Sequence, residues 1–288
     1  WLKNYYLGSG IVGSVDDRRR FALFSWCIAS MGAHLCCYCL VEVPPVAGKS
    51  PEAVRQALRE LNRMYSGTAN EVSYMPISEG SKTHLATLLD SEEPVTYGEI
   101  PPLGVAQMLR HVGARPGQRY YDLGSGFGKT VALAWLLGLD STGVELVQER
   151  WEVACRALDR YKDEEGNGPE GIRNLCASLT DVDFADGDIV FAYSLLFTEE
   201  MLEAVAQTAR RMRPGAVVVS STGIPGSGFE FGEPFACRNV WNTYDLNFKV
   251  QKVVGGDLSG DAMNSSCSSA SGESEPTSVS GGCACANH

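Results

Sequence analysis

The chain has 288 residues, of which 44% are hydrophobic, so it is long enough to bury one substantial core with flanking segments. Its formal net charge is −11 and its pI is near 4.9, with no run of lysines. This charge excludes the electrostatic footprint of a protein that holds nucleic acid unaided, so we expect no strong intrinsic nucleic-acid binding. The cysteines form no disulfide pattern, which favours a reducing compartment, and no spaced set of cysteines and histidines indicates a metal site.

An uncharged segment lies near the start of the sequence. Residues 21–41 contain no Asp, Glu, Lys or Arg, follow three consecutive arginines and precede a proline pair. A helix of this length crosses a hydrocarbon core of about 30 Å, with the arginines on the cytoplasmic side. The segment also carries serine, histidine and cysteine, which favour a buried element of a soluble protein. For residues 1–50, a membrane anchor and a soluble element therefore both remain open.

Residues 51–113 are predicted to form a helical lead-in. Ser50, Pro51 and Glu52 make a good helix start, with serine as the cap, proline in the first turn and an acid favoured by the helix dipole. Apolar residues then recur at helical spacing. A second helix is predicted over 103–112, after a proline pair, and residues 95–100 form a polar and aromatic turn before it.

Strands and helices alternate regularly in residues 114–254. The predicted strands lie at 119–123, 142–146, 172–177, 189–194 and 216–222, and the predicted helices at 128–137, 148–161 and 199–212. This alternation predicts an α/β fold with a mostly parallel sheet and helices on both faces. Residues 240–254 alternate with period two and are expected to supply an antiparallel C-terminal edge pair. Residues 255–288 are rich in Ser and Gly and are expected to be a disordered tail.

The most informative stretch is YYDLGSGFGK at positions 120–129. A predicted strand that ends near Asp122 leads into a turn with Gly124, Gly126 and Gly128, where the absence of Cβ atoms lets the backbone approach a ligand closely. Glu145 ends the next strand, where an acid can bind the two hydroxyls of a ribose. The combination is typical of a site for a nucleotide-shaped cofactor.

The spacing of the turn separates three interpretations. A phosphate-binding P-loop requires a glycine where Leu123 stands, so it is excluded. A dinucleotide fingerprint is off by one position, because the third glycine is Gly128, and is disfavoured. Asp122, directly before the turn, would repel a pyrophosphate and suits the sulfonium and amino groups of S-adenosylmethionine. The remaining alternative is that the glycine turn only joins a strand to a helix. Lys129, which follows the turn, is expected to be a solvated residue of the first helical turn.

Three motifs occur in an order and spacing that match a known family. They are TYGE at 96–99, DLGSGFGK at 122–129 and GVE at 143–145. Together they resemble the signature of the disruptor-of-telomeric-silencing family of histone lysine methyltransferases, over roughly residues 95–254. The resemblance implies a class I methyltransferase with a Rossmann-like sheet, S-adenosylmethionine as cofactor, lysine methylation of a histone, and a chromatin regulator located in the nucleus.

The resemblance also implies roles for individual residues. Tyr97 and Glu99, together with Thr96 of the same loop, would fold over the methionine end of the cofactor. Glu145 would bind the ribose hydroxyls, and Gly128 would let the following helix pack close to the sheet. The amino-acid and ribose parts of the cofactor would be lined by Asp122, Gly124, Ser125 and Gly126.

The chain departs from the family pattern at two positions. Where the family has an acid that receives the adenine amino group, this chain has Ser178, which would accept that hydrogen bond more weakly. Where the family places an asparagine beside the entering lysine, this chain has Tyr193 or Ser194, which are the candidate catalytic residues. Tyr193 can hydrogen-bond an amine and attract a methylated cation, or it can fill the channel.

The first functional hypothesis is an S-adenosylmethionine-dependent lysine N-methyltransferase that acts on a core histone. An acidic chain suits a basic protein partner, including histone within nucleosomes. Two alternatives remain open: a membrane-attached lysine methyltransferase of a non-histone protein, prompted by residues 21–41, and a catalytically inactive cofactor-binding scaffold, prompted by Ser178 and Tyr193. The sequence does not indicate an oligomeric state.

Overall fold

The computed structural model describes residues 43–66, 78–89, 99–238, 245–255 and 282–285. The segment 21–41 and the loop residues Thr96 and Tyr97 lie outside these ranges, so their interpretation stays a prediction. Within the described ranges, no helix is both long and apolar enough to cross a membrane.

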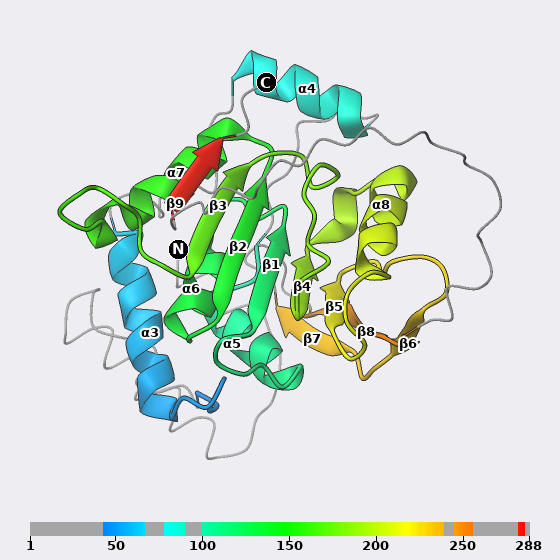
Figure 1. Ribbon diagram of the computed structural model, residues 1–288, viewed down its shortest axis with the longest axis horizontal. Helices are drawn as coiled ribbons and strands as arrows, with labels where there is room; N and C mark the ends of the chain where they lie inside the picture. The colour runs from blue at the N-terminus through cyan, green and yellow to red at the C-terminus, as the bar shows by residue number, and fades with distance from the viewer. Residues whose placement is uncertain (1–42, 67–77, 90–98, 239–244, 256–281, 286–288) are drawn as a thin grey trace, which may run out of the picture.

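A mixed sheet forms the centre of the molecule, with its strands in the order β6-β8-β5-β4-β1-β2-β3-β9 (Figure 1). The parallel strands are β1 (Arg119–Leu123), β2 (Asp140–Glu145), β3 (Ile172–Cys176), β4 (Ile189–Ala192), β5 (Val217–Ser220) and β9 (Gly282–Cys285). The long strand β8 (Asp245–Val253) runs antiparallel to β5, and it also pairs with β6 (Phe229–Phe231) and β7 (Phe235–Arg238). The predicted α/β fold, a mostly parallel sheet with an antiparallel C-terminal edge, is confirmed.

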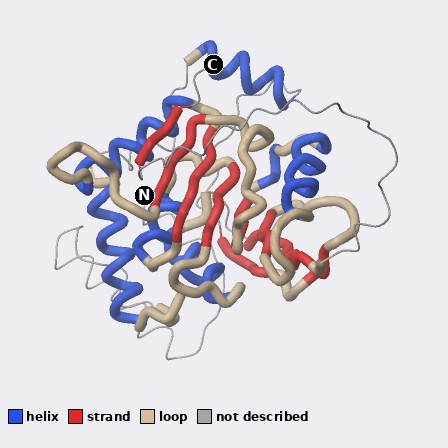
Figure 2. Tube along the Cα trace, viewed as in Figure 1, coloured by secondary structure: helices blue, strands red, loops and turns tan. Residues whose placement is uncertain are grey.

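Helices cover both faces of this sheet, as predicted (Figure 2). One face carries α3 (Pro51–Met64), α5 (Pro102–His111), α6 (Lys129–Leu136) and α7 (Gln148–Leu158), and the other carries α8 (Glu199–Ala209). The remaining helices are α4 (Glu79–Leu89) and the short 3-10 helices η3 (Asp159–Tyr161) and η4 (Ser194–Leu196). The predicted cap of α3 is present, because the Ser50 hydroxyl accepts a hydrogen bond from the Ala53 amide.

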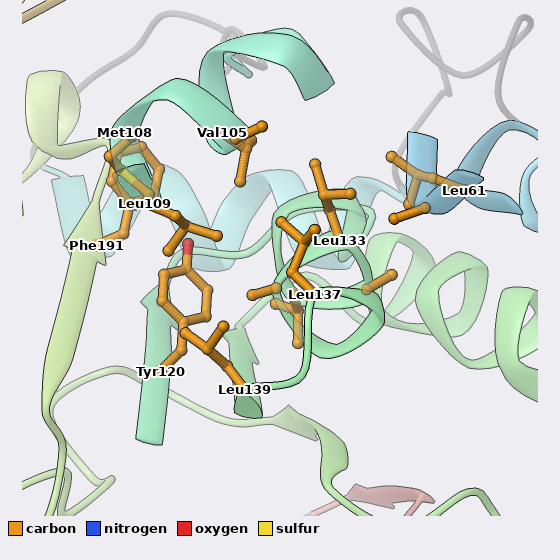
Figure 3. Packing of buried hydrophobic residues seen from close by; sticks show 14 of the residues in the cluster. Leu61, Val105, Met108, Leu109, Tyr120, Leu133, Leu137, Leu139 and Phe191 are labelled. Carbon is orange, nitrogen blue, oxygen red and sulfur yellow. The ribbon is translucent and has the colours of Figure 1, made fainter. Parts of the chain in front are cut away.

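The alternation of side chains along β1 separates two hydrophobic cores. Tyr120 joins the core beneath α3, α5 and α6, whereas its neighbour Tyr121 joins the core beneath α8. Figure 3 shows the Tyr120 ring pointing from β1 toward Leu109 of α5, near Leu139. Each large side chain buried in this way contributes about 1.5–3 kcal/mol. This packing holds β1 rigidly up to the turn that follows it.

The C-terminal part of the chain corrects two expectations. Residues 282–285, assigned to a disordered tail, form β9 and pair in parallel with β3. The cysteine spacing shows no disulfide pattern, but Cys155 of α7 and Cys283 of β9 form a disulfide across 128 residues of sequence. Composition predicts which segments bury large apolar side chains. It does not reveal β9, a short strand of small residues that is held by backbone hydrogen bonds and a disulfide. Residues 256–281 lie outside the described ranges.

Helix α6 begins directly after a glycine with left-handed backbone geometry. Gly128 has a φ of 72° and is the N-cap of this helix. A Cβ atom at this position would lie 2.8 Å from Cβ of Ala154 and 3.2 Å from Oδ1 of Asn174. The family resemblance predicts that Gly128 lets the following helix pack close to the sheet, and the neighbours that Gly128 approaches belong to α7 and β3.

We predict that Gly128→Ala destabilises the fold more than Gly113→Ala, a matched control. Both glycines have a positive φ, 72° and 68°, but a Cβ at Gly113 would meet nothing within 4 Å. Each substitution should cost about 1–2 kcal/mol for the left-handed backbone. Gly128→Ala should cost about 1–3 kcal/mol more, because the added methyl group overlaps Ala154. Urea unfolding measures both, and equal losses would contradict this packing.

Candidate cofactor and active site

A pocket lies at the carboxyl ends of β1 and β4. These strands are neighbours at the point where the strand order reverses, which is where open parallel sheets bind ligands. The pocket is lined by Glu99, Ile100, Asp122, Gly124, Ser125, Lys129, Thr130, Phe191 and Tyr193. The structure therefore brings together five of the residues singled out from the sequence: Glu99, Asp122, Gly124, Ser125 and Tyr193.

The Asp122 carboxyl group is buried at the pocket wall. Only 2% of the residue is exposed, and one of its oxygens accepts a hydrogen bond from the Thr130 hydroxyl. The other oxygen, Oδ1, has no hydrogen-bond partner among the described residues. Burial, helped by the negative charge of Glu145 and opposed by the Thr130 hydrogen bond, raises the pKa of Asp122 to about 7. A buried carboxylate oxygen without a partner fits a cationic group such as the amino group of S-adenosylmethionine.

The Glu145 carboxylate lies beneath the glycine turn. Its Oε2 accepts a hydrogen bond of 2.7 Å from the Gly126 amide, and its Oε1 accepts one of 2.8 Å from the Val147 amide. An ionised carboxylate has about four acceptor positions, so about two remain for other donors. This arrangement fits the expectation that Glu145 binds ribose hydroxyls, which stays a prediction.

The turn after β1 lies directly on β2. The amides of Gly124 and Ser125 both donate to the carbonyl of Val144, at 2.8 and 2.9 Å. Gly143 makes this approach tight, because a Cβ there would lie 2.8 Å from Ser125 Oγ and 2.8 Å from Val131 Cγ2. A glycine inside a strand signals such a close approach. The sequence places Gly143 in the GVE motif, but this packing role depends on Ser125 and Val131 and could not be predicted from the motif.

An ion pair corrects the expectation that Lys129 is solvated. Its Nζ lies 2.7 Å from Oε1 of Glu99, and the two side chains are only 19% and 14% exposed. Both residues line the pocket, so the pair joins the start of α6 to the end of the loop that contains the TYGE motif. The local sequence around Lys129 cannot show whether this lysine is solvated or paired, because its partner Glu99 lies 30 residues away.

Tyr65, at the end of α3, contacts the glycine turn, and this contact is not predicted from the sequence. Its hydroxyl donates a hydrogen bond of 2.8 Å to the carbonyl of Phe127, inside the glycine turn. Burial raises the pKa of Tyr65 far above its usual value, so the hydroxyl stays a neutral donor. The lead-in helix therefore supports the turn directly. Its sequence signal is only an aromatic residue at the end of an amphipathic pattern.

The two candidate catalytic residues have different surroundings. Tyr193 lines the pocket, and its ring centroid lies 5.7 Å from that of Phe248 in β8. Ser194 is fully buried, and its Oγ lies 2.7 Å from Oγ1 of Thr222 and accepts from the Thr222 amide. The Ser194 side chain therefore bonds to the segment after β5 and does not line the pocket. The catalytic roles of both residues stay predictions.

Other proposed site residues lie outside the pocket lining. Ser178 forms a local turn, with its Oγ 2.7 Å from Oγ1 of Thr180. Gly126, Gly128 and Glu145 are also absent from the pocket lining: Gly126 bonds to Glu145, and Gly128 caps α6. Thr96 and Tyr97 lie outside the described residues. In the part of the chain that the structure describes, no three His, Cys, Asp or Glu side chains are grouped to hold a metal ion.

A doubly wound sheet, a glycine turn after β1, an acid at the end of β2 and antiparallel final strands define a class I methyltransferase fold. The family model described as "Histone methylation protein DOT1" matches residues 89–246, more than half of the chain. The chain therefore belongs to the DOT1 family of histone methylation proteins, as the motifs predicted. This membership implies S-adenosylmethionine as the cofactor, and the unpartnered Asp122 oxygen and the Glu145 carboxylate fit it.

A relative and two solved structures extend the comparison. A protein of Candida albicans named "Histone-lysine N-methyltransferase, H3 lysine-79 specific" is 28% identical over 144 residues, which are 43% of this chain and 10% of that protein. The chain thus spans about a tenth of that relative. A putative RNA methyltransferase from Pyrococcus horikoshii has a TM-score of 0.42 at 15% identity, covering 61% of this chain and all of its own. Magnesium protoporphyrin IX methyltransferase from Synechocystis has a TM-score of 0.39 at 14% identity, covering 68% and 90%. Both scores are too low to support an inference about function.

We predict that Asp122→Asn changes how stability depends on pH. The folded chain keeps a proton on Asp122 up to about pH 7, whereas the unfolded chain releases it near pH 3.8. This group therefore makes the free energy of unfolding fall as pH rises through that window. The variant should lack this decrease and be more stable than the wild type at pH 8, by a few kcal/mol at most, since one pKa unit is about 1.4 kcal/mol. Urea unfolding at pH 5 and pH 8 measures the free energy of unfolding of both proteins. The same pH dependence in both would contradict a raised pKa of Asp122.

Proposed function

We propose that this chain is an S-adenosylmethionine-dependent lysine N-methyltransferase that acts on a core histone in the nucleus. The observation that carries the proposal is the convergence of Asp122, Glu99 and Tyr193 on one pocket at the reversal point of the sheet. Membership of the DOT1 family supports the reaction class, and the name of the Candida albicans relative supports a histone substrate.

The cofactor would be held by groups at the ends of β1 and β2. Asp122 would accept a hydrogen bond from the amino group through its unpartnered Oδ1. Glu145 would accept from the ribose hydroxyls through its remaining lone pairs. Gly124 would let the backbone come close to the ligand, because it has no Cβ atom and its φ of 85° is one that other residues rarely adopt. When bound, S-adenosylmethionine supplies an electrophilic methyl group.

Tyr193 is placed to orient the target amine. Methyl transfer requires a neutral amine held in line with the sulfonium, with little proton chemistry beyond the loss of one proton. The Tyr193 hydroxyl would accept a hydrogen bond from that amine, and its ring would attract the methylated cation. Packing of the ring near Phe248 fixes its position on the pocket wall. The Lys129–Glu99 ion pair forms another part of the pocket wall.

The surface beside Tyr193 suits a basic polypeptide. Leu195 and Leu196 of η4 directly follow Tyr193 and are 50% and 48% exposed. The first turn of α8 then presents the exposed acids Glu199 and Glu200. Apolar contact next to negative charge favours a lysine-rich segment with an apolar residue, which a histone offers. The net charge of −11 acts in the same direction.

Incubation of the chain with nucleosomes and methyl-labelled S-adenosylmethionine tests the proposal. We expect transfer of label to a histone lysine. Gly124→Arg should abolish cofactor binding, because its side chain would occupy the ligand space, whereas Gly113→Arg, with similar backbone strain but open surroundings, should bind and transfer normally. Tyr193→Ala should bind cofactor and lose transfer.

Three results would count against this assignment. Absence of cofactor binding by the wild type would refute the reaction class. Transfer to other lysine-rich proteins but not to nucleosomes would refute the histone substrate. Undiminished transfer by Tyr193→Ala would refute the role of that residue.

A further inference from the structure

We infer that β9 is a cover for the outer edge of β3, held in place by the Cys155–Cys283 disulfide and released when a dithiol reduces that bond. The inference goes beyond the proposed function and does not depend on it. It rests on the weak intrinsic pairing of β9, on the position of the disulfide and on the edge that β9 covers.

Strand β9 has little to hold it on the sheet by itself. Its sequence, GCAC, contains no side chain of large apolar surface, and glycine and alanine are poor strand formers. Gly282 is only half-buried and Cys283 is exposed. Since hydrophobic stabilisation scales with buried area, at about 25 cal/mol per Å², this strand gains little from burial.

The disulfide provides the missing attachment. Cys155 lies on α7, which packs beside β3 and also contacts β9. With the bond intact, β9 is kept at a high effective concentration next to its pairing edge. Without it, the segment between Gly255 and Gly282 must be closed into a loop by backbone pairing alone, and that closure costs entropy. The oxidised chain therefore favours the docked strand, and the reduced chain favours release.

The covered edge comprises four of the five residues of β3. The register runs from Arg173 opposite Gly282 to Cys176 opposite Cys285. On its other side β3 pairs with β2, the strand that ends in Glu145. Release of β9 would leave backbone N–H and C=O groups of β3 unpaired, which is an open strand edge. The redox state of the Cys155–Cys283 bond thus decides whether the outer edge of β3 is covered. Only β3 separates this edge from β2.

The exchange reaction is balanced with a dithiol as reductant. A thiolate of the dithiol attacks Sγ of the exposed Cys283, and Cys155 leaves as a thiolate and takes up a proton. The second thiol of the dithiol then attacks the mixed disulfide, releasing Cys283 as a thiol and closing the dithiol into a cyclic disulfide. Two electrons and two protons pass from the dithiol to the cysteine pair.

Whether the Cys155–Cys283 disulfide acts as a switch or as a permanent structural bond depends on the compartment. Disulfides in cytosolic and nuclear proteins are usually transient or redox-sensing, because thiol systems keep most cysteines reduced. In a reducing compartment, the open edge would be the resting state and oxidation would close it. A purely structural staple would require an oxidising compartment instead.

Hydrogen exchange of the full chain, with and without dithiothreitol, tests the inference. We expect reduction to accelerate exchange of the β3 amides that pair with β9, by roughly tenfold or more, and to leave the β1 amides unchanged. Alkylation and mass analysis verify that Cys155 and Cys283 have become thiols. Unchanged protection of β3 after verified reduction would overturn the inference, as would unprotected β9-facing amides in the oxidised chain.

A double variant, Cys155→Ser with Cys283→Ser, separates this bond from the other cysteines of the chain. It should show the fast β3 exchange of the reduced wild type and should not respond further to dithiothreitol. Protection of β3 equal to that of the oxidised wild type in this variant would show that β9 docks without the bond, and would also overturn the inference.

Discussion

The Glu145 carboxylate is the constraint on which the site depends. It binds the amide of Gly126 in the turn after β1 and the amide of Val147 at the start of α7, so two βα turns are tied to one buried charge. The same turn is held to β2 by the Val144 carbonyl and to α3 by the Tyr65 hydroxyl. Because these contacts come from both β2 and the end of α3, the backbone next to the pocket is fixed before any ligand binds. Preorganisation of this kind reduces the cost of binding.

The pocket contains two locally unfavourable arrangements. Asp122 is buried with an oxygen that lacks a described partner, and its raised pKa is a direct cost of that burial. The Lys129–Glu99 pair places a cation at the start of a helix, where the dipole disfavours it. Unfavourable local arrangements tend to concentrate at functional sites. A cationic ligand would offset the first of these, which links this local cost to the proposed use of the pocket.

Local patterns predicted most of the fold, and long-range contacts account for what was missed. Strand and helix alternation and the acid–glycine turn are written in neighbouring residues, so the parallel order, the helices on both faces and the convergence of Asp122 and Tyr193 could be anticipated. Glu99, the ion-pair partner of Lys129, lies 30 residues away from it, and Phe127, which accepts the hydrogen bond of Tyr65, lies 62 residues away. Hydrophobic periodicity gives no information about contacts at such separations. Strand β9 escaped detection because Ser- and Gly-rich composition hides a strand held by a disulfide.

The central claim is that Asp122 receives the amino group of S-adenosylmethionine, and calorimetry in two buffers of different ionisation enthalpy tests it most directly. At about pH 6.5 Asp122 should be largely protonated in the free chain, and a bound ammonium group should lower its pKa and displace the proton. We predict that binding releases roughly half a proton or more, and that the release disappears in Asp122→Asn. Binding of equal strength with no proton release in the wild type would contradict the account.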